Sequence, residues 1–384
     1  MSKVNVADLK SGMITASPVL TKNGQKIVDA GVTLDKRLIA RLDFYSISSV
    51  EILAEDTSTA QEPSVETEPV KPIAPVVEEN PVDRSSFLKA GNASNFQKIQ
   101  RSDEFRSFQV SYSVSVKDVK DQFELIAKGE PINFNSFLAS SMKILSEYHM
   151  TSIQLFDMLH NIRQVDDTIY AHCLNVAFIA RVLGKWMKFD KEEINLLTLA
   201  GLLHDIGKTK IPSEILTKPE KLNEQELEQV RKHSFYSYDM LKNYNLPEKV
   251  LSAILHHHER CDGSGYPDHL PSERLDDFTM IIAIADVYDA MTAARSYRGP
   301  LCPFTVISNF EKEGLQKYRP HVILTFLERI ANTYQNNRVL LNNGTQGTII
   351  MLNSSHLSRP IIKLDNDEFL DLSLNSSLCI TQIL

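Results

Sequence analysis

Residues 250–267 are "VLSAILHHHERCDGSGYP", an apolar run with helical spacing that ends in three histidines and a loop with two glycines and a proline. On a helix, the two apolar stripes that share Ile254 continue to His257 and His258, so both histidines are expected to point into the protein. His256 lies on the polar side of the same helix and is expected to be solvated. The stretch therefore predicts a helical protein with a pair of buried imidazoles.

A second apolar helix ends in a similar way within residues 199–212, "LAGLLHDIGKTKIP". His204 and Asp205 lie at its end. Consecutive helical residues diverge by about 100° around the axis, so two neighbouring inward ligands suit two adjacent metals better than one. Asp205 is placed to bridge two cations while His204 holds one of them, although a His-Asp pair alone is often structural.

Three more polar residues lie on apolar helix faces: His172, His233 and Asp286. A single inward histidine is more often a hydrogen-bonded core residue than a ligand, but a buried aspartate is rare without a partner. Such residues on several helices at once are harder to explain as packing. Together they predict one metal site.

The expected ligand set is rich in histidine, contains carboxylates and lacks thiolates, which favours Fe, Mn, Ni or Zn over Ca or Mg. Two such ions can hold a bridging hydroxide as the nucleophile and polarise a phosphoryl oxygen. Lys208, Arg295 and Arg298 would then hold the phosphate, although each has a solvated surface position as its alternative. The residues therefore predict metal-assisted cleavage of a phosphate ester.

The composition limits the classes of partner. The chain has 384 residues, of which 42% are hydrophobic and 23% charged, and its net charge is -8. This balance argues against a general binder of DNA, RNA or membrane surfaces. The four cysteines are scattered without a CxxC pair, which favours a reducing, cytoplasmic location over a disulfide framework. No apolar run is long enough to span a bilayer.

The pattern along the chain divides it into four regions. Residues 1–54 are predicted to form a small α+β module, because residues 10–54 contain short alternating strands, a turn at "KNGQ", a helix and a final strand "SSVEIL". Residues 55–100 are rich in Pro, Glu, Ser and Thr and are predicted to be a disordered linker. Residues 101–335 have helical periodicity, and residues 336–384 return to strand-like segments. The expected fold class is mainly α: a helical bundle with a small N-terminal α+β module and a small C-terminal β appendage.

The blocks "LLHDIGKTKIP", "ILTKPEKL", "HHHERCDGSGYP" and "IADVYDAMTAARSYR" together resemble the HD-GYP family, the cyclic di-GMP phosphodiesterase branch of the bacterial HD phosphohydrolases. The resemblance is specific, because the blocks occur in the order that the family has. It implies an HD-domain helical bundle in which Asp205 bridges two metals. The metal ligands that it implies are His172, His204, Asp205, His233, His257, His258 and Asp286.

By the same resemblance, the enzyme would hydrolyse cyclic di-GMP to pGpG, to GMP or to both through a metal-bridging hydroxide. Lys208 would contact the substrate phosphate and protonate the leaving group, and Arg295 and Arg298 would be further phosphate contacts. One loop would shape the substrate site and offer a surface to a protein partner such as a diguanylate cyclase: Gly265, Tyr266 and Pro267.

Two positions depart from the pattern of the family. Members commonly have Pro where this chain has Ser296. Some members bind a third metal through a Glu one turn before the first histidine ligand, where this chain has Thr168. Two divalent ions are therefore expected, Fe or Mn foremost, with Ni or Zn as alternatives. The segments "LKSGM" and "KNGQKIVDAGVTL" are similar to a small domain found upstream of many HD-GYP domains.

Two other functions stay open, and so does the hydrolysis of another cyclic dinucleotide such as cyclic GMP-AMP. A catalytically weak HD-GYP domain would bind cyclic di-GMP or recruit a partner without cleaving the nucleotide. A different HD phosphohydrolase would act on nucleoside triphosphates or guanosine tetraphosphate. The complete ligand set argues against the first function, and the loop with the paired His257 and His258 argues against the second. A homodimer stays open as an alternative to a monomer.

Overall fold

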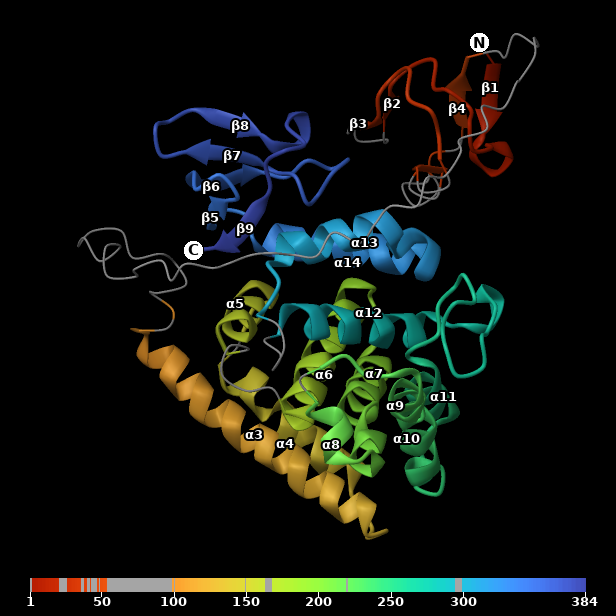
Figure 1. Ribbon diagram of the computed structural model, residues 1–384, viewed down its shortest axis with the longest axis vertical. Helices are drawn as coiled ribbons and strands as arrows, with labels where there is room; N and C mark the ends of the chain where they lie inside the picture. Colours follow the sequence, from red (N-terminus) through yellow and green to blue (C-terminus); the bar gives the residue numbers. More distant parts are fainter. Residues whose placement is uncertain are drawn as a thin grey trace.

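The computed structural model of this chain (Figure 1) describes most of the sequence outside the expected linker. Among the helices that it describes, none is both long enough and apolar enough to cross a membrane. The described residues are 2–20, 26–35, 38–39, 42, 47, 49–53, 99, 101–148, 150–162, 168–218, 220–293 and 299–384.

Helices make up the centre of the chain, in agreement with the expected fold class, which is confirmed as mainly α. They are α3 (Asp103–Ala127), α4 (Phe134–Glu147), α5 (Ser152–Ile162), α6 (Ile169–Trp186), α7 (Lys191–Leu203), α8 (Ser213–Leu216), α9 (Glu224–Arg231), α10 (His233–Leu241), α11 (Glu248–His256), α12 (Asp277–Thr292), α13 (Pro303–Lys317) and α14 (Pro320–Thr333). Short 3-10 turns are η3 (Ile206–Lys210) and η4 (Ser272–Arg274).

Polar side chains fix where several helices begin. The side chains of Ser102, Asp190 and Asp276 accept hydrogen bonds from backbone amides in the first turns of α3, α7 and α12. Asn223 forms a reciprocal capping box with Glu226 at the start of α9. Each cap satisfies an amide that the helix itself leaves unpaired, so these residues set the boundaries between helices.

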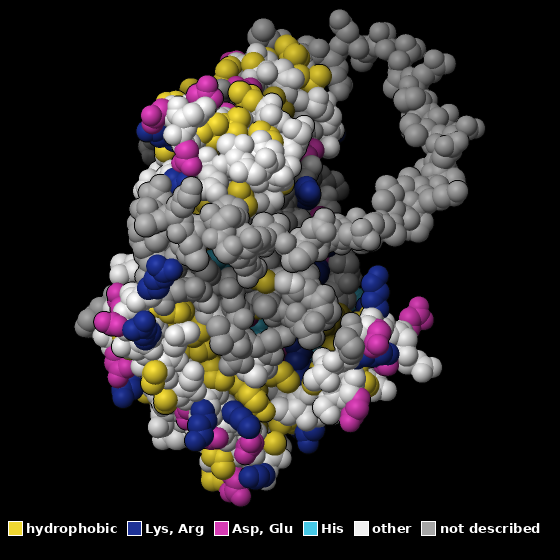
Figure 2. All heavy atoms as spheres, turned by 60° about the vertical axis from the view of Figure 1, so that its left-hand side comes forward, with side chains coloured by type: hydrophobic (Ala, Val, Ile, Leu, Met, Phe, Trp, Pro, Cys, Tyr) yellow, Lys and Arg dark blue, Asp and Glu magenta, His cyan; other side chains and the backbone are white. Residues whose placement is uncertain are grey.

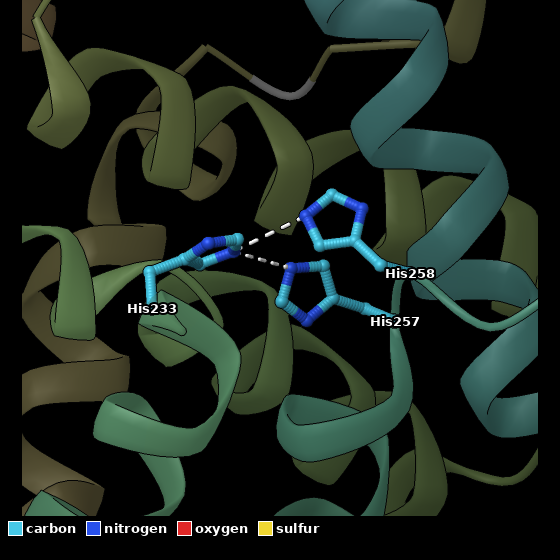
Figure 3. Close-up of side chains that lie close together, drawn as sticks. All are labelled: His233, His257 and His258. Atoms are coloured by element: carbon cyan, nitrogen blue, oxygen red, sulfur yellow. Dashed lines mark hydrogen bonds between the residues drawn. The ribbon is translucent and has the colours of Figure 1, made fainter. Parts of the chain in front are cut away.

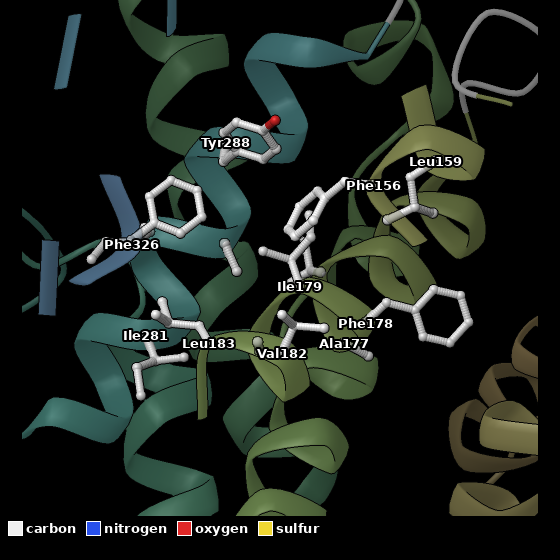
Figure 4. Packing of buried hydrophobic residues seen from close by; sticks show 14 of the residues in the cluster. Phe156, Leu159, Ala177, Phe178, Ile179, Val182, Leu183, Ile281, Tyr288 and Phe326 are labelled. Atoms are coloured by element: carbon white, nitrogen blue, oxygen red, sulfur yellow. The ribbon is translucent and has the colours of Figure 1, made fainter. Parts of the chain in front are cut away.

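Helix α6 lies at the centre of the helical part and contacts α3, α7, α12 and α14. Figure 4 shows its side chains, among them Ile179 and Leu183, meeting those of α5, α12 and α14. Phe156 of α5 and Phe326 of α14 pack edge-on against Tyr288 of α12. Polar residues of α6 and α12 are therefore surrounded by apolar packing on most sides.

Five antiparallel strands follow the helices in the order β8-β7-β6-β5-β9. Their bounds are β5 (Arg338–Leu341), β6 (Gln346–Met351), β7 (Ile361–Leu364), β8 (Phe369–Asp371) and β9 (Ile380–Ile383), with η5 (Leu372–Leu374) after β8. Val339 and Ile380 belong to the same buried cluster as the helical core. The Glu311 carboxylate on α13 accepts hydrogen bonds from the backbone amide and hydroxyl of Ser358. The sheet is therefore packed on α13 and shares the core of the helices (Figure 1).

The N-terminal region has its own small core, which includes Leu34 and Val50. Its elements are β1 (Ser2–Asn5), η1 (Val6–Asp8), β2 (Val19–Leu20), β3 (Lys26–Val28) and β4 (Ser49–Ile52). The strand expected at "SSVEIL" is β4, which pairs with β1, a strand that the sequence pattern did not predict. The expected turn at "KNGQ" and nearly all of the expected linker lie outside the described residues.

Charged side chains of both signs lie interspersed on the helical face shown in Figure 2. The full sequence has 41 Lys and Arg and 49 Asp and Glu, so its net charge of -8 is a small difference between large numbers of both signs. Mixed surfaces of this kind are ordinary for globular domains.

Replacing Phe326 with Ala should lower the free energy of unfolding by about 3–5 kcal/mol, because the ring is fully buried against Tyr288 and Phe310. Urea unfolding followed by circular dichroism would measure this change. Phe369→Ala is the matched control, since Phe369 on β8 is 66% exposed. Equal losses in the two variants would contradict the assignment of Phe326 to the core.

Candidate metal centre

Seven side chains from six helices and turns meet at one buried point. His172 comes from α6, Asp286 from α12, and His233 begins α10. The others follow directly on the ends of α7 and α11. We call this set the His–Asp cluster, and its members are His172, His204, Asp205, His233, His257, His258 and Asp286. The sequence predicted all seven as ligands, and the structure brings them together.

Three of the histidines are held by the carbonyl groups of helix ends. The Nδ1 atoms of His204, His233 and His257 lie 2.8, 2.6 and 2.7 Å from the carbonyl oxygens of the residues three positions earlier, Gly201, Val230 and Ile254. Carbonyl groups in the last turn of a helix have no backbone partner within it. Because a carbonyl only accepts, each Nδ1 carries the proton and each Nε2 presents a lone pair.

The freed Nε2 atoms face one another. His233 Nε2 lies 3.3 Å from His257 Nε2 and 3.1 Å from His258 Nε2 (Figure 3). In Figure 3, the rings of His257 and His258 both turn toward His233. Lone pairs at these separations repel each other unless a cation or proton lies among them. This group of three therefore has the donor atoms and the geometry of a metal site.

A second group forms around His172 and His204. His172 Nε2 lies 3.1 Å from Asp286 Oδ1, and His204 Nε2 lies 3.9 Å from the same oxygen. His204 Nε2 is buried and has no hydrogen-bond partner among the described residues. A buried polar atom without a partner is costly, and a bound cation would satisfy it.

Asp205 lies between the two groups and turns one oxygen toward each. Its Oδ2 is 3.5 Å from both His172 Nε2 and His204 Nε2. Its Oδ1 is 3.2 Å from His233 Nε2 and 3.9 Å from His257 Nε2. The carboxylate is therefore placed as a bridging ligand would be. Nitrogen and oxygen donors without thiolate suit Mn, Fe, Ni or Zn.

Burial and neighbouring charges favour the protonation states that metal ligands need. Burial, with His204 and His233 nearby, holds the pKa of His257 well below its usual range, and burial does the same to the pKa of His258. Burial opposes the charged form of Asp205, but Lys208 and His204 hold its pKa well below the usual range. Neutral imidazoles and an ionised carboxylate are the forms that bind metal.

His172 is the exception to this trend. Burial opposes its protonation, but hydrogen bonds to Asp286 and Asp289 raise its pKa to about 9. Two carboxylates therefore favour a positive charge at this ring. A divalent cation at Nε2 would supply that charge as a proton does.

Asp289 was not among the predicted site residues. It is fully buried, and its Oδ2 lies 2.8 Å from His172 Nδ1. A carboxylate on the outer nitrogen fixes the orientation of a metal-binding histidine and increases its basicity. One sequence feature could have predicted Asp289. It lies one turn after Asp286 in an apolar helix, where a second acidic residue on the same face is unexpected.

Lys208 lies next to the cluster, as the sequence predicted. Its Nζ is 2.5 Å from Asp205 Oδ2, and its side chain is partly exposed. Thr168 stands at the position for which the resemblance gave a Glu ligand in some members, and it caps α6 by accepting a hydrogen bond from the Ala171 amide. Two predicted phosphate contacts lie outside the described residues: Arg295 and Arg298.

The loop after α11 folds back on the histidine pair. The Tyr266 ring stacks on His258 with centroids 4.6 Å apart. Gly265 passes so close to the chain that a Cβ there would lie 2.3 Å from Glu259 Cα. The buried Glu259 carboxylate, which was not among the predicted site residues, accepts hydrogen bonds from the amides of Asp268 and Leu270. Pro267 follows in the same loop and lines a cavity beside it.

His256 points away from the cluster, as expected, but it is not simply solvated. Its Nε2 lies 3.1 Å from Asp268 Oδ2, and its Nδ1 lies 3.3 Å from the Ser252 hydroxyl. The expectation of a solvated ring is corrected on this point. The ring ties the end of α11 to the loop and is partly buried.

The cluster lies in the part of the chain that is similar to known proteins. Residues 137–322 match the family model described as HD domain. The cyclic di-GMP phosphodiesterase PA4108 of Pseudomonas aeruginosa is 31% identical over 207 residues, 54% of this chain and 50% of that protein. The response regulator RpfG of Xanthomonas campestris, also named a cyclic di-GMP phosphodiesterase, is 30% identical over 225 residues, 58% of this chain and 57% of the relative.

A third relative has a different named substrate. The 3'3'-cGAMP-specific phosphodiesterase 1 of Vibrio cholerae is 43% identical over 132 residues, which are 34% of this chain and 31% of that protein. The chain thus spans about half the length of the first two curated relatives and a smaller part of the third.

Replacing Asp289 with Asn should weaken metal binding about 10- to 100-fold, because the carboxylate that orients His172 is lost while the shape is kept. Titration of metal-stripped protein with Mn would measure the affinity. Asp268→Asn is the control, since Asp268 contacts His256 outside the cluster. Unchanged Mn affinity in Asp289→Asn would show that this carboxylate does not support a metal site.

Proposed function

The helical part of this chain belongs to the HD-GYP family of HD domains, and from this membership and the cluster geometry we propose that the protein is a metal-dependent cyclic di-GMP phosphodiesterase. The main support for this proposal is the position of Asp205, whose two carboxylate oxygens face two separate groups of imidazole nitrogens. A carboxylate in this position suits a dinuclear centre, and two adjacent metals suit hydrolysis of a phosphodiester.

The proposed ligands divide into two sets that share Asp205. His172, His204 and Asp286 would hold one divalent ion, and the other three histidines of the cluster would hold the second. Bound ions would polarise a phosphoryl oxygen and yield hydroxide from water near neutral pH. Fe or Mn is the proposed metal, with Ni or Zn as alternatives on the same donor atoms.

Lys208 is the proposed acid and phosphate contact. Hydrolysis breaks the bond between phosphorus and the 3′ oxygen. The hydroxide oxygen stays on phosphorus, and the leaving 3′ oxygen takes up a proton. The Lys208 ammonium, which lies beside Asp205 and is partly exposed, would donate that proton and pair with a non-bridging oxygen. One such cleavage gives linear pGpG, and a second gives GMP.

The substrate class comes from the relatives. Those with 30–31% identity are named for cyclic di-GMP, and the relative with 43% identity over a shorter stretch is named for 3'3'-cGAMP. Because both nucleotides contain two phosphodiesters in one ring, the same cluster chemistry applies to either. Cyclic di-GMP is the proposed substrate, and 3'3'-cGAMP is the second candidate.

Several wider expectations also remain proposals. The loop around Tyr266 would face a protein partner such as a diguanylate cyclase, and Arg295 and Arg298 would contact phosphate. All four cysteines are free thiols, which suits the proposed cytoplasmic location. A homodimer and a monomer are both compatible with the fold described above.

Anaerobic purification, elemental analysis and chromatography of cyclic di-GMP would test the function. About two Fe or Mn ions per chain, with pGpG or GMP appearing, would support a phosphodiesterase. Two ions with the nucleotide bound but intact would favour a regulatory domain that recruits a partner. Cleavage of nucleoside triphosphates or guanosine tetraphosphate in place of cyclic dinucleotides would favour another HD phosphohydrolase.

Asp205→Ala should lose bound metal and activity together, because the carboxylate faces both groups of histidines. Metal per chain and turnover of cyclic di-GMP are the measurements. His256→Ala is the control, and it should keep its metal because that ring contacts Ser252 and Asp268 instead. Full activity in Asp205→Ala would rule out the proposed centre.

A further inference from the structure

A cavity of about 210 Å³ lies between the junction of α9 with α10 and the loop after α11. Arg231 and Lys232 line it from the junction, and Phe235 lines it from α10. Tyr266 and Pro267 line it from the loop. Complete ligand pockets usually measure roughly 300–1,000 Å³, so this cavity suits a part of a larger ligand.

The cavity borders the His–Asp cluster. Lys232 directly precedes His233, which faces Asp205 from the start of α10. The Tyr266 ring has His258 stacked on it at 4.6 Å and the Arg231 guanidinium 5.6 Å from its centre. Because Tyr266 lines the cavity and also contacts His258, the cavity and the proposed metal site are neighbours. One ligand could therefore occupy both.

The lining combines cations with an exposed aromatic ring. Arg231 and Lys232 contribute two positive charges, and Glu228 contributes one negative charge 3.9 Å from Arg231. Phe235 is 52% exposed, which is unusual for so large an apolar side chain. An aromatic ring beside cations is a common arrangement for binding a nucleotide, because the ring stacks on the base and the cations pair with phosphate.

A cyclic dinucleotide is larger than the cluster that would cleave it. Only one of its two phosphodiesters can lie at the metals in a given turnover. The other phosphodiester keeps its negative charge and, with the bases, must rest on protein or remain in water. A neighbouring cavity with cations and a free aromatic face would provide such a place.

We propose that this cavity is the subsite for the nucleotide that is not being cleaved, with Phe235 stacked on its purine base and Arg231 and Lys232 paired with its phosphate. This inference rests on the proposed function. It adds Phe235 as a residue that discriminates dinucleotides from simple diesters. The sequence did not predict Phe235 as a site residue. Phe235 acts on substrate binding, and the metal ligands act on the reaction.

The test compares two substrates in the full chain loaded with Mn. Cyclic di-GMP would reach the cavity, whereas bis(p-nitrophenyl) phosphate is a diester without bases. Phe235→Ala should lower kcat/KM for cyclic di-GMP about tenfold, chiefly by raising KM. Removing an aromatic side chain on which a base stacks typically weakens nucleotide binding by about that factor. The loss with the simple diester should be at least fivefold smaller. Phe235→Tyr, which keeps the ring, should restore dinucleotide hydrolysis.

Phe369→Ala is the matched control, because Phe369 is an equally large exposed ring on β8. It should change neither substrate's kinetics. Equal losses for both substrates in Phe235→Ala, or no loss for either, would overturn the subsite.

Direct binding of cyclic di-GMP by calorimetry separates this inference from the proposed function. If the wild-type protein binds the nucleotide without cleaving it, the phosphodiesterase proposal fails, and weaker binding in Phe235→Ala still supports the subsite. If the wild-type protein neither binds nor cleaves it, both proposals fail. Unchanged affinity in Phe235→Ala refutes the subsite alone.

Discussion

The Asp205 carboxylate, buried between two sets of imidazole nitrogens, is the contact on which the centre of this molecule depends. An ionised carboxylate inside a protein is stable only with compensating positive charge. Lys208 supplies one such charge from the side of the cluster. The Nε2 atoms that surround Asp205 carry lone pairs, and divalent cations bound there would satisfy both the carboxylate and these lone pairs. The ends of α7 and α11, the start of α10 and inward positions of α6 and α12 all contribute to this point.

Helix ends serve two purposes at this point. The last-turn carbonyls of α7, α9 and α11 have no partner within the regular i→i+4 pattern of the helix, and histidines three positions later bond to them. The same hydrogen bonds fix the tautomer of each ring and aim its Nε2 inward. Local backbone requirements and the orientation of the imidazole rings are thus met by one contact at each position. These three histidines stand at or just beyond helix ends, whereas His172 lies within α6.

Periodicity and residue type were enough to predict the helical class and the seven members of the His–Asp cluster, because ligands must occupy inward positions beside apolar stripes. They were not enough for Asp289 or Glu259. Both are buried acidic residues whose partners, His172 and two loop amides, come from distant or irregular parts of the chain. Strand β1 was also missed, since its partner β4 lies more than forty residues away in the sequence. Phe235 looked like any helix residue, and its exposure depends on the loop that leaves it uncovered.

The C-terminal sheet shares its buried residues with the helices and is joined to α13 through Glu311 and Ser358. A sheet with a separate core would melt by itself and leave the helices intact. Here the loss of either part exposes the apolar surface of the other, so the two form one cooperative unit when heated. Thermal damage to strands far from the His–Asp cluster would therefore reach the cluster in the same transition.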